Sequence, residues 1–152
     1  RDRARGLCPV RLEAEGLAEA LRELAAGTGN VFGCDCRFQC DPPVDVSDHT
    51  MAIHLYRIAQ EAVSNALKHG HARRIEIRLT ANSRSVTLAV NDNGAGIPHR
   101  RPDRKGLGLQ IMRYRAEVIG GSLLVQPNPP GGISVLCTVG REPQMHNARH
   151  TK

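Results

Sequence analysis

The segment from Ile53 to Gly70 has the pattern of an amphipathic helix, and it constrains the fold more than any other part of the chain. Apolar residues recur there at three- and four-residue steps, which places them on one helical face. This stripe consists of Leu55, Ile58, Ala59, Ala62, Ala66 and Leu67. Glu61, Asn65 and Lys68 stand at i, i+4 and i+7 and form a second, polar row. Such a row could serve a hydroxyl or water, a metal ion and a phosphate, but taken alone it is better explained as a solvated face with a Glu–Lys pair.

Length and composition limit the possible partners. The chain has 152 residues, which is the size of one domain with a real core. Only 3% of its residues are aromatic and none is Trp, so the core must be aliphatic. The formal net charge of +6 is spread along the chain. Few aromatic side chains are available to stack on bases, so nucleic-acid binding is disfavoured. An anionic small ligand or an acidic protein partner accounts equally well for the charge.

The chain resembles a piece of a longer cytoplasmic protein. No apolar run approaches the roughly 20 residues that cross a bilayer, and no secretory signal is visible. The five cysteines are odd in number and lack the spacing of a disulfide framework, which fits a reducing compartment. Because the sequence begins at Arg1 without Met, it leaves open whether the parent protein is anchored in a membrane.

The first part of the chain predicts a helix followed by a strand. Leucines recur at roughly helical steps from Leu12 to Leu24, and the residues from Gly27 to Asn30 are expected to end that helix. Apolar and polar residues then alternate from Phe32 to Cys40, which predicts a strand with one buried face.

The three cysteines of this strand have a C-x-C-x3-C pattern with two interpretations. A cysteine cluster of this kind can bind a metal ion. All three thiols, however, share one face with two phenylalanines, and a buried cysteine behaves as a small hydrophobic residue. No histidine lies near them on the strand, so core packing is the favoured interpretation.

Two further strands are predicted to form a hairpin that ends in a buried acid. Ser47 or Asp48 can cap the central helix. After that helix, alternating apolar residues predict strands around residues 75–81 and 86–90, with a turn between them. One more step of this alternation places Asp92 on the inward face. A carboxylate there is costly unless something binds it.

Glycine-rich segments follow this acid. Gly94 and Gly96 allow the backbone to turn and a ligand to approach it closely. The segment from Gly106 to Leu109 opens a second helix that ends at Gly120-Gly121, and a helix N-terminus after glycines suits phosphate. Two strands, at residues 123–126 and 133–139, complete the pattern, and the residues beyond Gly140 have no periodicity.

The combination of these motifs is more specific than any one of them. E-x3-N-x2-K-H on a helix, D-x-G-x-G at a strand end and G-x-G-L opening a helix occur in this order. They resemble the ATP-binding catalytic domain of sensor histidine kinases, within the GHKL superfamily. Three segments are most similar to the nitrate-sensor subfamily: RIAQEAVSNALKH, VNDNGAGI and GLGLQIMRYRAEVIGG. The resemblance covers roughly Leu12 to Val139.

We therefore expect an α/β two-layer sandwich, in which a mixed, largely antiparallel sheet carries about three helices on one face. Residues 1–10 would be the remnant of an upstream linker, residues 11–141 the catalytic domain, and residues 142–152 a flexible tail.

The resemblance implies a role for each polar residue of the central helix. Asn65 would hold Mg²⁺, whose other ligands are largely phosphate oxygens and water. Glu61 would be the carboxylate that orients or deprotonates the attacking group. Lys68 and His69 would face the phosphates. The plainer alternatives are that Glu61 pairs with a basic neighbour and that His69 complements the dipole at the helix C-terminus.

The glycine segments would bind the rest of the ATP molecule. Asp92 would accept a hydrogen bond from the adenine amino group, and Gly94 and Gly96 would shape the adenine pocket. The segment expected to wrap the phosphates comprises Gly106, Leu107, Gly108 and Leu109. The basic residues before it (Arg100, Arg101, Arg104 and Lys105) are expected to be solvated, and Arg115 is expected to be a surface or interdomain contact.

The implied reaction is transfer of the ATP γ-phosphate to a histidine on an upstream dimerisation domain, and then to an aspartate of a response regulator. Positioning and charge neutralisation supply most of the rate in such transfers. The parent would be a homodimer. The resemblance places the acceptor histidine on an upstream helix beside acidic residues. None of the histidines considered sits in such a context: His49, His54, His69, His71 and His99. We therefore expect this chain to hold only the nucleotide-binding half of the kinase.

Two other functions stay open at this point. The chain could be a nucleotide-binding signalling module without transfer activity, or a GHKL serine kinase of the anti-sigma type. One departure from the subfamily favours the first: Ile133 follows Gly132 where a Thr is usual. A lost hydrogen bond to the ligand costs about 0.5–1.5 kcal/mol, which weakens binding without abolishing it.

Overall fold

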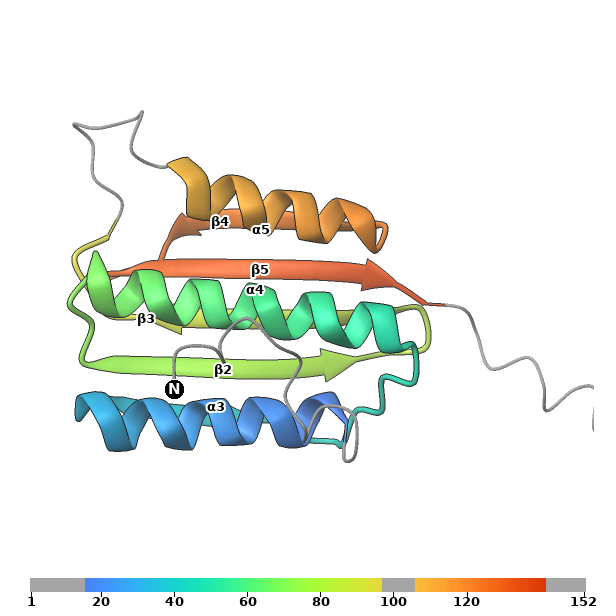
Figure 1. The fold of residues 1–152 in the computed structure, drawn as a ribbon, viewed down its shortest axis with the longest axis horizontal. Coiled ribbons are helices and arrows are strands. Elements are labelled where there is room, and N and C mark those ends of the chain that lie inside the picture. Colours follow the sequence, from blue (N-terminus) through green and yellow to red (C-terminus); the bar gives the residue numbers. More distant parts are fainter. Residues whose placement is uncertain (1–15, 97–105, 142–152) are drawn as a thin grey trace, which may run out of the picture.

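The structure, a computed structural model, has two layers: a sheet, and a layer of helices on one of its faces (Figure 1). It describes residues 16–96 and 106–141. Within these residues three helices cover a five-stranded mixed sheet, and the expected fold class is confirmed. The elements are α3 (Leu17–Phe32), β1 (Asp35–Gln39), α4 (His49–Lys68), β2 (Arg74–Ala81), β3 (Ser85–Asp92), α5 (Gly106–Val118), β4 (Gly121–Pro127) and β5 (Ile133–Gly140).

The sheet has the strand order β1-β2-β3-β5-β4. Strands β1 and β2 are parallel, because the chain between them crosses over through α4. The other three pairs are antiparallel, and β2 and β3 form the predicted hairpin. In this hairpin Ile75 pairs with Asp92, so the acid lies at the end of the ladder beside the start of β2.

The core between the layers is aliphatic, as the composition predicts. On α4, Leu55 and Ile58 are fully buried, and on β2 the alternating residues Ile75, Ile77 and Leu79 are fully buried as well. Each such side chain contributes roughly 1.5–3 kcal/mol through burial. The apolar stripe of the central helix is therefore the face that packs on the sheet, and the polar row points away from it.

Helix α3 continues beyond the predicted end. The expectation that it stops within residues 27–30 was wrong, since it runs to Phe32 and ends at Gly33, which has a φ of 69°. The N–H of Gly33 donates to the carbonyl of Gly29 at 3.0 Å. Thr28 is buried in the same helix, and this packing offsets the roughly 1 kcal/mol that each helical glycine costs. Phe32 consequently belongs to the helix, is 63% exposed, and is not part of the strand.

The cysteines near β1 pack in the core, as the favoured interpretation predicts. Cys34 is buried, while Cys36 and Cys40 are half-buried against the main cluster. Among the described residues no group of three or more metal-binding side chains is found. None of the helices in residues 16–96 and 106–141 is long and apolar enough to span a membrane.

We predict that the thiols of Cys36 and Cys137 stay protonated well into the alkaline range. Burial raises the pKa of Cys36 to about 12 and that of Cys137 to about 11, from an ordinary value of 9.0. Neither thiol should react with a disulfide reagent at pH 8 unless the domain unfolds. Above pH 9 the unfolded chain releases these protons while the folded chain keeps them, so the free energy of unfolding should fall as pH rises. Denaturant titrations at pH 8 and pH 10 measure this; equal stability would contradict it.

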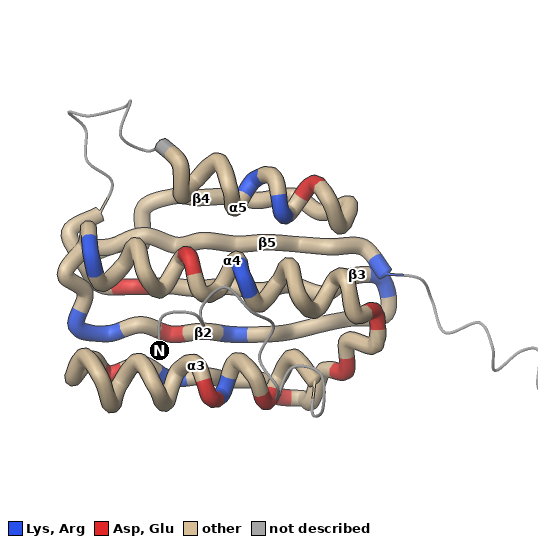
Figure 2. Tube along the Cα trace, in the orientation of Figure 1, with Lys and Arg blue, Asp and Glu red and all other residues tan. Residues whose placement is uncertain are grey.

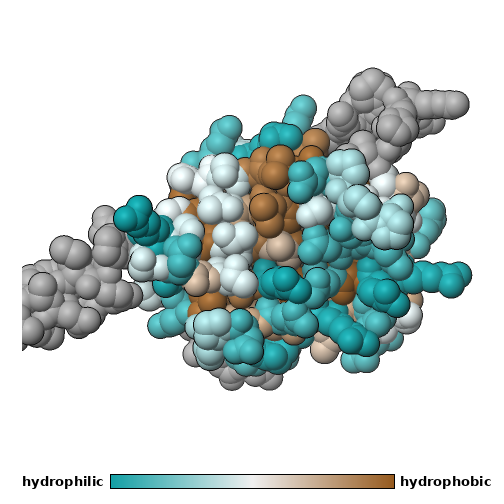
Figure 3. All heavy atoms as spheres, turned by 180° about the vertical axis from the view of Figure 1, so that it is seen from behind, coloured by the Kyte–Doolittle hydropathy of each residue, from teal (hydrophilic) through white to brown (hydrophobic). Residues whose placement is uncertain are grey.

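The uncovered face of the sheet divides into a charged and an apolar part. Strands β4 and β5 contain no Lys, Arg, Asp or Glu and are tan along their length in Figure 2. Figure 3, which views this face, shows a small apolar area among hydrophilic side chains. The strand register aligns Ala89, Leu136 and Leu124 in one row across β3, β5 and β4. Strands β1 and β2 present mostly charged residues there, including Arg37, Glu76 and Arg78.

Candidate functional site

The segments that carry the motifs meet at one end of the molecule (Figure 1). The C-terminal end of α4, the end of β3, the start of α5 and the turn between β4 and β5 all lie there. This arrangement follows from the antiparallel pairing of β3 with β2 and β5, which brings the end of one strand to the start of its neighbours. Motifs far apart in the sequence therefore surround one region.

The polar row of α4 faces the start of α5. The side chain of Asp48 caps α4 by accepting a hydrogen bond from the N–H of Met51 at 3.1 Å, as one of the two predicted caps. Near the other end of the helix, Glu61 and Asn65 are half-buried beside Gly108. A Cβ atom at Gly108 would collide with Oε2 of Glu61 and lie 3.5 Å from Nδ2 of Asn65. A side chain at position 108 would therefore displace the carboxylate of Glu61, and glycine lets α5 approach the two side chains as they stand.

The side chains of Glu61 and Asn65 are not held by a close polar contact with a described residue, although Glu61 interacts electrostatically with Arg115. In the described part of the chain, no ion pair or side-chain hydrogen bond involves either of them. The expected alternative, a structural pair between Glu61 and Lys68, is thus not found there. A carboxylate and an amide that are half-buried and lack such contacts are available to a ligand.

A groove of about 560 Å³ lies over α4, between α3 and α5. It reaches Glu61 and Lys68 but not Asn65 or Asp92. Its lining residues are Leu24, Thr28, Phe32, Arg57, Gln60, Glu61, Val63, Ser64, Leu67, Lys68, Ile111 and Arg115. The groove therefore opens onto the carboxylate of Glu61 from outside the helix layer.

Arg115 lines the groove over α4, and it also makes a contact within the domain. It is half-buried on α5, and its Nη1 lies 3.2 Å from Nδ1 of His54 on α4. Burial, and then the nearby Arg57, lower the pKa of Arg115, while Glu61 opposes this shift. Burial and the adjacent guanidinium also lower the pKa of His54, which disfavours its charged form. Arg115 thus joins α5 to α4 within the domain.

Asp92 is buried, as the strand alternation predicts, with 7% of its surface exposed. Its Oδ1 accepts hydrogen bonds from the N–H of Gly94 at 2.7 Å and from the N–H of Ile133 at 3.3 Å. Burial raises the pKa of this carboxyl, and the two N–H donors partly counteract the rise. None of the described residues donates to Oδ2. One oxygen is therefore fixed by the protein and the other can accept from a ligand.

Backbone contacts join Asp92 to the end of α4. A Cβ atom at Gly94 would lie 2.9 Å from the carbonyl carbon of Gly70, so the two glycines pack directly on each other. The N–H of Ala95 donates to the carbonyl of Gly70 at 2.9 Å. On the other side Gly96, with a φ of 89°, lies beside Gly132. The glycine turn is thus held between the helix end and the β4–β5 turn.

The remaining predicted residues are less closely assembled. Lys68 is exposed where α4 ends, and His69 is exposed as its C-cap, donating its backbone N–H to the carbonyl of Asn65. Gly106 begins α5, Leu107 is 72% exposed, and Leu109 packs against the core. The four basic residues at positions 100, 101, 104 and 105 lie outside the described residues.

Three residues of the site were not predicted: Gly70, Asn93 and Asn128. Gly70 was treated only as the end of a helix, although its carbonyl and Cα form the contact with the glycine turn. Asn128 donates from its side chain to the carbonyl of Asp92 at 2.8 Å. The sequence contains no direct signal for either contact, because each joins segments more than twenty residues apart.

Two sensor proteins are similar to this chain in sequence. The nitrate/nitrite sensor protein NarX of Escherichia coli strain K12 is 34% identical over 129 residues, which are 85% of this chain and 22% of NarX. NarQ, the nitrate/nitrite sensor protein of the same strain, is 35% identical over 141 residues, or 90% of this chain and 25% of NarQ. The chain thus spans a quarter or less of the length of these relatives.

Solved structures share the fold. The ATP-binding domain of PrrB from Mycobacterium tuberculosis matches with a TM-score of 0.64 at 21% identity, covering 82% of this chain and 93% of that one. A blue-light activated histidine kinase, EL346 of Erythrobacter litoralis, matches with a TM-score of 0.67 at 23% identity, covering 81% and 44%. The family model described as "Histidine kinase-, DNA gyrase B-, and HSP90-like ATPase" matches residues 50–143. These residues include α4, Asp92 and the start of α5, and the chain belongs to this ATPase family.

Proposed function

We propose that this chain is the ATP-binding catalytic domain of a sensor histidine kinase, which transfers the γ-phosphate of ATP to a histidine on an upstream domain. Family membership and the sensor relatives support this function. The observation that carries it is the meeting, at one end of the fold, of a free Asp92 oxygen with the side chains of Glu61 and Asn65. Backbone packing between Gly70 and Gly94 joins these two halves.

The adenine is bound in this proposal by the buried acid. Oδ2 of Asp92 accepts a hydrogen bond from the exocyclic amino group, while Oδ1 stays on the protein's own N–H groups. Hydrogen bonds to a charged acceptor contribute about 1.5–3 kcal/mol. Gly94 and Gly96 lack side chains that would fill the adjoining space, so a flat base can lie against the backbone.

The side chain of Asn65, near the C-terminal end of α4, suits a magnesium ion. Mg²⁺ prefers oxygen ligands and keeps several waters, so one protein amide oxygen beside substrate phosphates is a typical set. Asn65 offers such an oxygen, half-buried and without a side-chain hydrogen bond to the described residues. When bound, the ion would neutralise charge on the phosphates. Asn65 is the residue that we propose to hold it.

Glu61 is proposed to act on the attacking group. The bond between the γ-phosphorus and the bridging oxygen breaks, a bond to an imidazole nitrogen forms, and ADP leaves. Glu61 orients that imidazole by accepting a hydrogen bond from its N–H. The groove over α4 opens onto this carboxylate, so a helix of another domain can present a histidine there. Lys68 borders the same groove and would attract the phosphates.

The rest of the protein is also part of the proposal. Residues 11–141 would form the catalytic domain, with residues 1–10 belonging to an upstream linker and residues 142–152 to a tail. The acceptor histidine would lie on a dimerisation domain of a homodimeric, cytoplasmic or membrane-anchored parent. A response regulator would take the phosphate from it.

Substitution of Asn65 tests this function. In a protein extended upstream through the acceptor histidine, ATP and Mg²⁺ should give an acid-labile, base-stable phosphate on that histidine. Asn65→Ala should slow this labelling at least about tenfold, because an interaction with the transferred group's charge is lost. Asn30→Ala is the matched control: it makes the same change at an exposed position of α3 that does not line the groove, and it should label like the unmodified protein.

The outcomes separate the competing functions. Equal labelling by Asn65→Ala and the unmodified protein would contradict the assigned role. Binding of Mg-ATP in calorimetry without any labelling would identify a nucleotide-binding module, which the apolar Ile133 favours mildly. Mass spectrometry that finds phosphoserine would identify a serine kinase.

A further inference from the structure

Asn128 holds the backbone of Asp92 from the turn between β4 and β5. Its side-chain Nδ2 donates to the carbonyl of Asp92 at 2.8 Å, and its own N–H donates to the carbonyl of Gly132 at 3.1 Å. Asn128 is half-buried. One residue thus closes its own turn and attaches that turn to the strand end that carries the buried acid.

This contact replaces a backbone pairing that is missing. The ladder between β3 and β5 extends only as far as the pair Asn91–Ser134, one residue short of Asp92. Beyond it, Gly132 packs against the Asp92 carbonyl with a φ of 107°, and a Cβ atom there would collide with the carbonyl oxygen. The side chain of Asn128 supplies a donor to that oxygen where the regular ladder no longer does.

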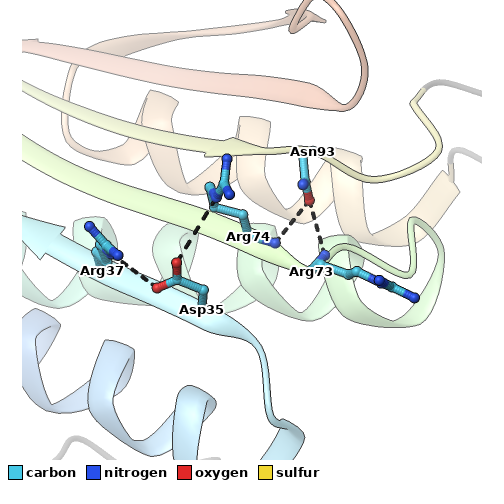
Figure 4. Close-up of polar contacts among 5 residues, drawn as sticks. All are labelled: Asp35, Arg37, Arg73, Arg74 and Asn93. Atoms are coloured by element: carbon cyan, nitrogen blue, oxygen red, sulfur yellow. Dashed lines mark hydrogen bonds and ion pairs between the residues drawn. The ribbon is translucent and has the colours of Figure 1, made fainter.

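On the side of β2, the end of β3 is held by Asn93 (Figure 4). Asn93 accepts the N–H groups of Arg73 and Arg74 on its Oδ1, at 3.0 and 2.8 Å, and donates its own N–H to the carbonyl of Arg74 at 3.1 Å. These bonds fix the chain between α4 and β2, but none of them reaches Asp92 itself. Of the two asparagines, only Asn128 acts directly on the acid's backbone.

Loss of the Asn128 contact would change the carboxylate. Oδ1 of Asp92 is held by two donors, and the longer bond, at 3.3 Å, comes from Ile133 in the segment that Asn128 secures. If the turn shifts, this bond weakens first and the carboxylate can rotate about its remaining bond to Gly94. The direction of Oδ2 is then no longer fixed.

We propose that Asn128 is a positioning residue for base recognition: through the Asp92 carbonyl and the Ile133 N–H it orients the free carboxylate oxygen toward the adenine. The inference rests on the proposed ATP-binding function. It requires a donor at position 128, and it separates recognition of the base from recognition of the phosphates, which takes place beside Asn65 and Lys68.

The test compares ATP with tripolyphosphate, both with Mg²⁺, by calorimetry on the full chain. Asn128→Asp keeps the shape of the side chain but replaces the donor with an acceptor that faces a carbonyl. We expect it to weaken ATP binding about tenfold and to leave tripolyphosphate binding unchanged, as the loss of one hydrogen bond plus repulsion predicts. Asn128→Ala, which only removes the donor, should weaken ATP binding about threefold to fivefold.

Asn82→Asp is the matched control. Asn82 lies in the β2–β3 turn, and its Oδ1 accepts N–H groups of Arg84 and Ser85 at 2.7 and 2.8 Å. Aspartate can still accept both, so this variant should bind ATP like the unmodified chain.

Three results would overturn the inference. The first is ATP binding by Asn128→Asp that equals that of the unmodified chain. The second is equal weakening of ATP and tripolyphosphate, which would make the role merely structural. The third applies if Asn128→Asp does not fold: it is ATP binding by Asn128→Ala that equals that of the unmodified chain. By contrast, an unmodified chain that binds no ATP would overturn the proposed function itself.

Discussion

Gly132→Ala should destabilise the domain by about 2–6 kcal/mol, because two costs add at this position. A φ of 107° lies in a region that side-chain-bearing residues rarely adopt. The new Cβ atom would also collide with the backbone oxygen of Asp92 and lie 2.8 Å from its Oδ1. Since domains of this size are stable by only about 5–15 kcal/mol, the variant should melt at least about 5 °C lower or fail to accumulate.

Gly131→Ala is the control for Gly132→Ala. Its Cβ atom would meet the carbonyl oxygen of Gly94 at 3.5 Å, an ordinary contact, and Gly131 is not among the positive-φ glycines. We expect a change of less than about 1 kcal/mol. Thermal unfolding followed by circular dichroism measures both variants. If the two melt within about 2 °C of each other, the turn does not pack on Asp92 as described.

Asp92→Asn should abolish most nucleotide affinity while leaving the fold intact. The amide oxygen can still accept the N–H groups of Gly94 and Ile133, so the protein's own bonds are kept. At the Oδ2 position, however, an NH₂ donor would face the adenine amino group, which is also a donor. Losing a charge-assisted bond of about 1.5–3 kcal/mol corresponds to a roughly 10- to 150-fold weaker Kd for ATP.

The stability of the same variant tests the environment of the acid. Burial raises the pKa of Asp92, which means that the folded protein disfavours the charged form. At pH 7 the neutral amide should therefore be tolerated, with stability equal to or above that of the unmodified chain. In the unmodified chain, Asp92 binds a proton more tightly when the protein is folded, so the free energy of unfolding rises as pH falls toward 3.8, the ordinary pKa of Asp. The difference in stability between Asp92→Asn and the unmodified chain should therefore shrink at low pH.

Asn91→Asp is the matched control for Asp92→Asn. It makes the opposite charge change one residue earlier, where Oδ1 accepts the hydroxyl of Ser134 at 2.6 Å. Calorimetry with ATP should show affinity like that of the unmodified chain. Because the two charge changes are opposite, comparable losses for both variants would indicate a general disturbance of the end of β3 rather than the loss of a contact with the base.

Short-range patterns predicted most of the fold. The steps between Leu55, Ile58 and Ala62 correctly identified the buried face of α4, and alternation along β2 and β3 correctly placed Asp92 inside. These predictions succeeded because periodicity reports directly which side of an element is apolar. The resemblance to a known family then supplied the fold class, which comparisons confirm.

The errors have a common physical origin in long-range packing. Glycine propensity predicted that α3 would end before Gly33, but burial of Thr28 outweighed it. The contact between the guanidinium of Arg115 and His54, sixty-one positions away, was not predicted. The bond from Asn128 to Asp92 spans thirty-six positions. No local pattern encodes such pairs, since each depends on how the strands and helices are arranged in space.

The close packing of Gly70 on Gly94 has a consequence for ligand size. The contact joins backbone to backbone and involves no flexible side chain. The distance between the carboxylate of Asp92 and the amide of Asn65 is therefore expected to vary little. The contact between Gly70 and Gly94 thus fixes how long a molecule must be to reach both Asp92 and Asn65. A nucleotide whose phosphates extend the right distance from its base would touch both ends at once, and a shorter one, such as a monophosphate, would reach only the first.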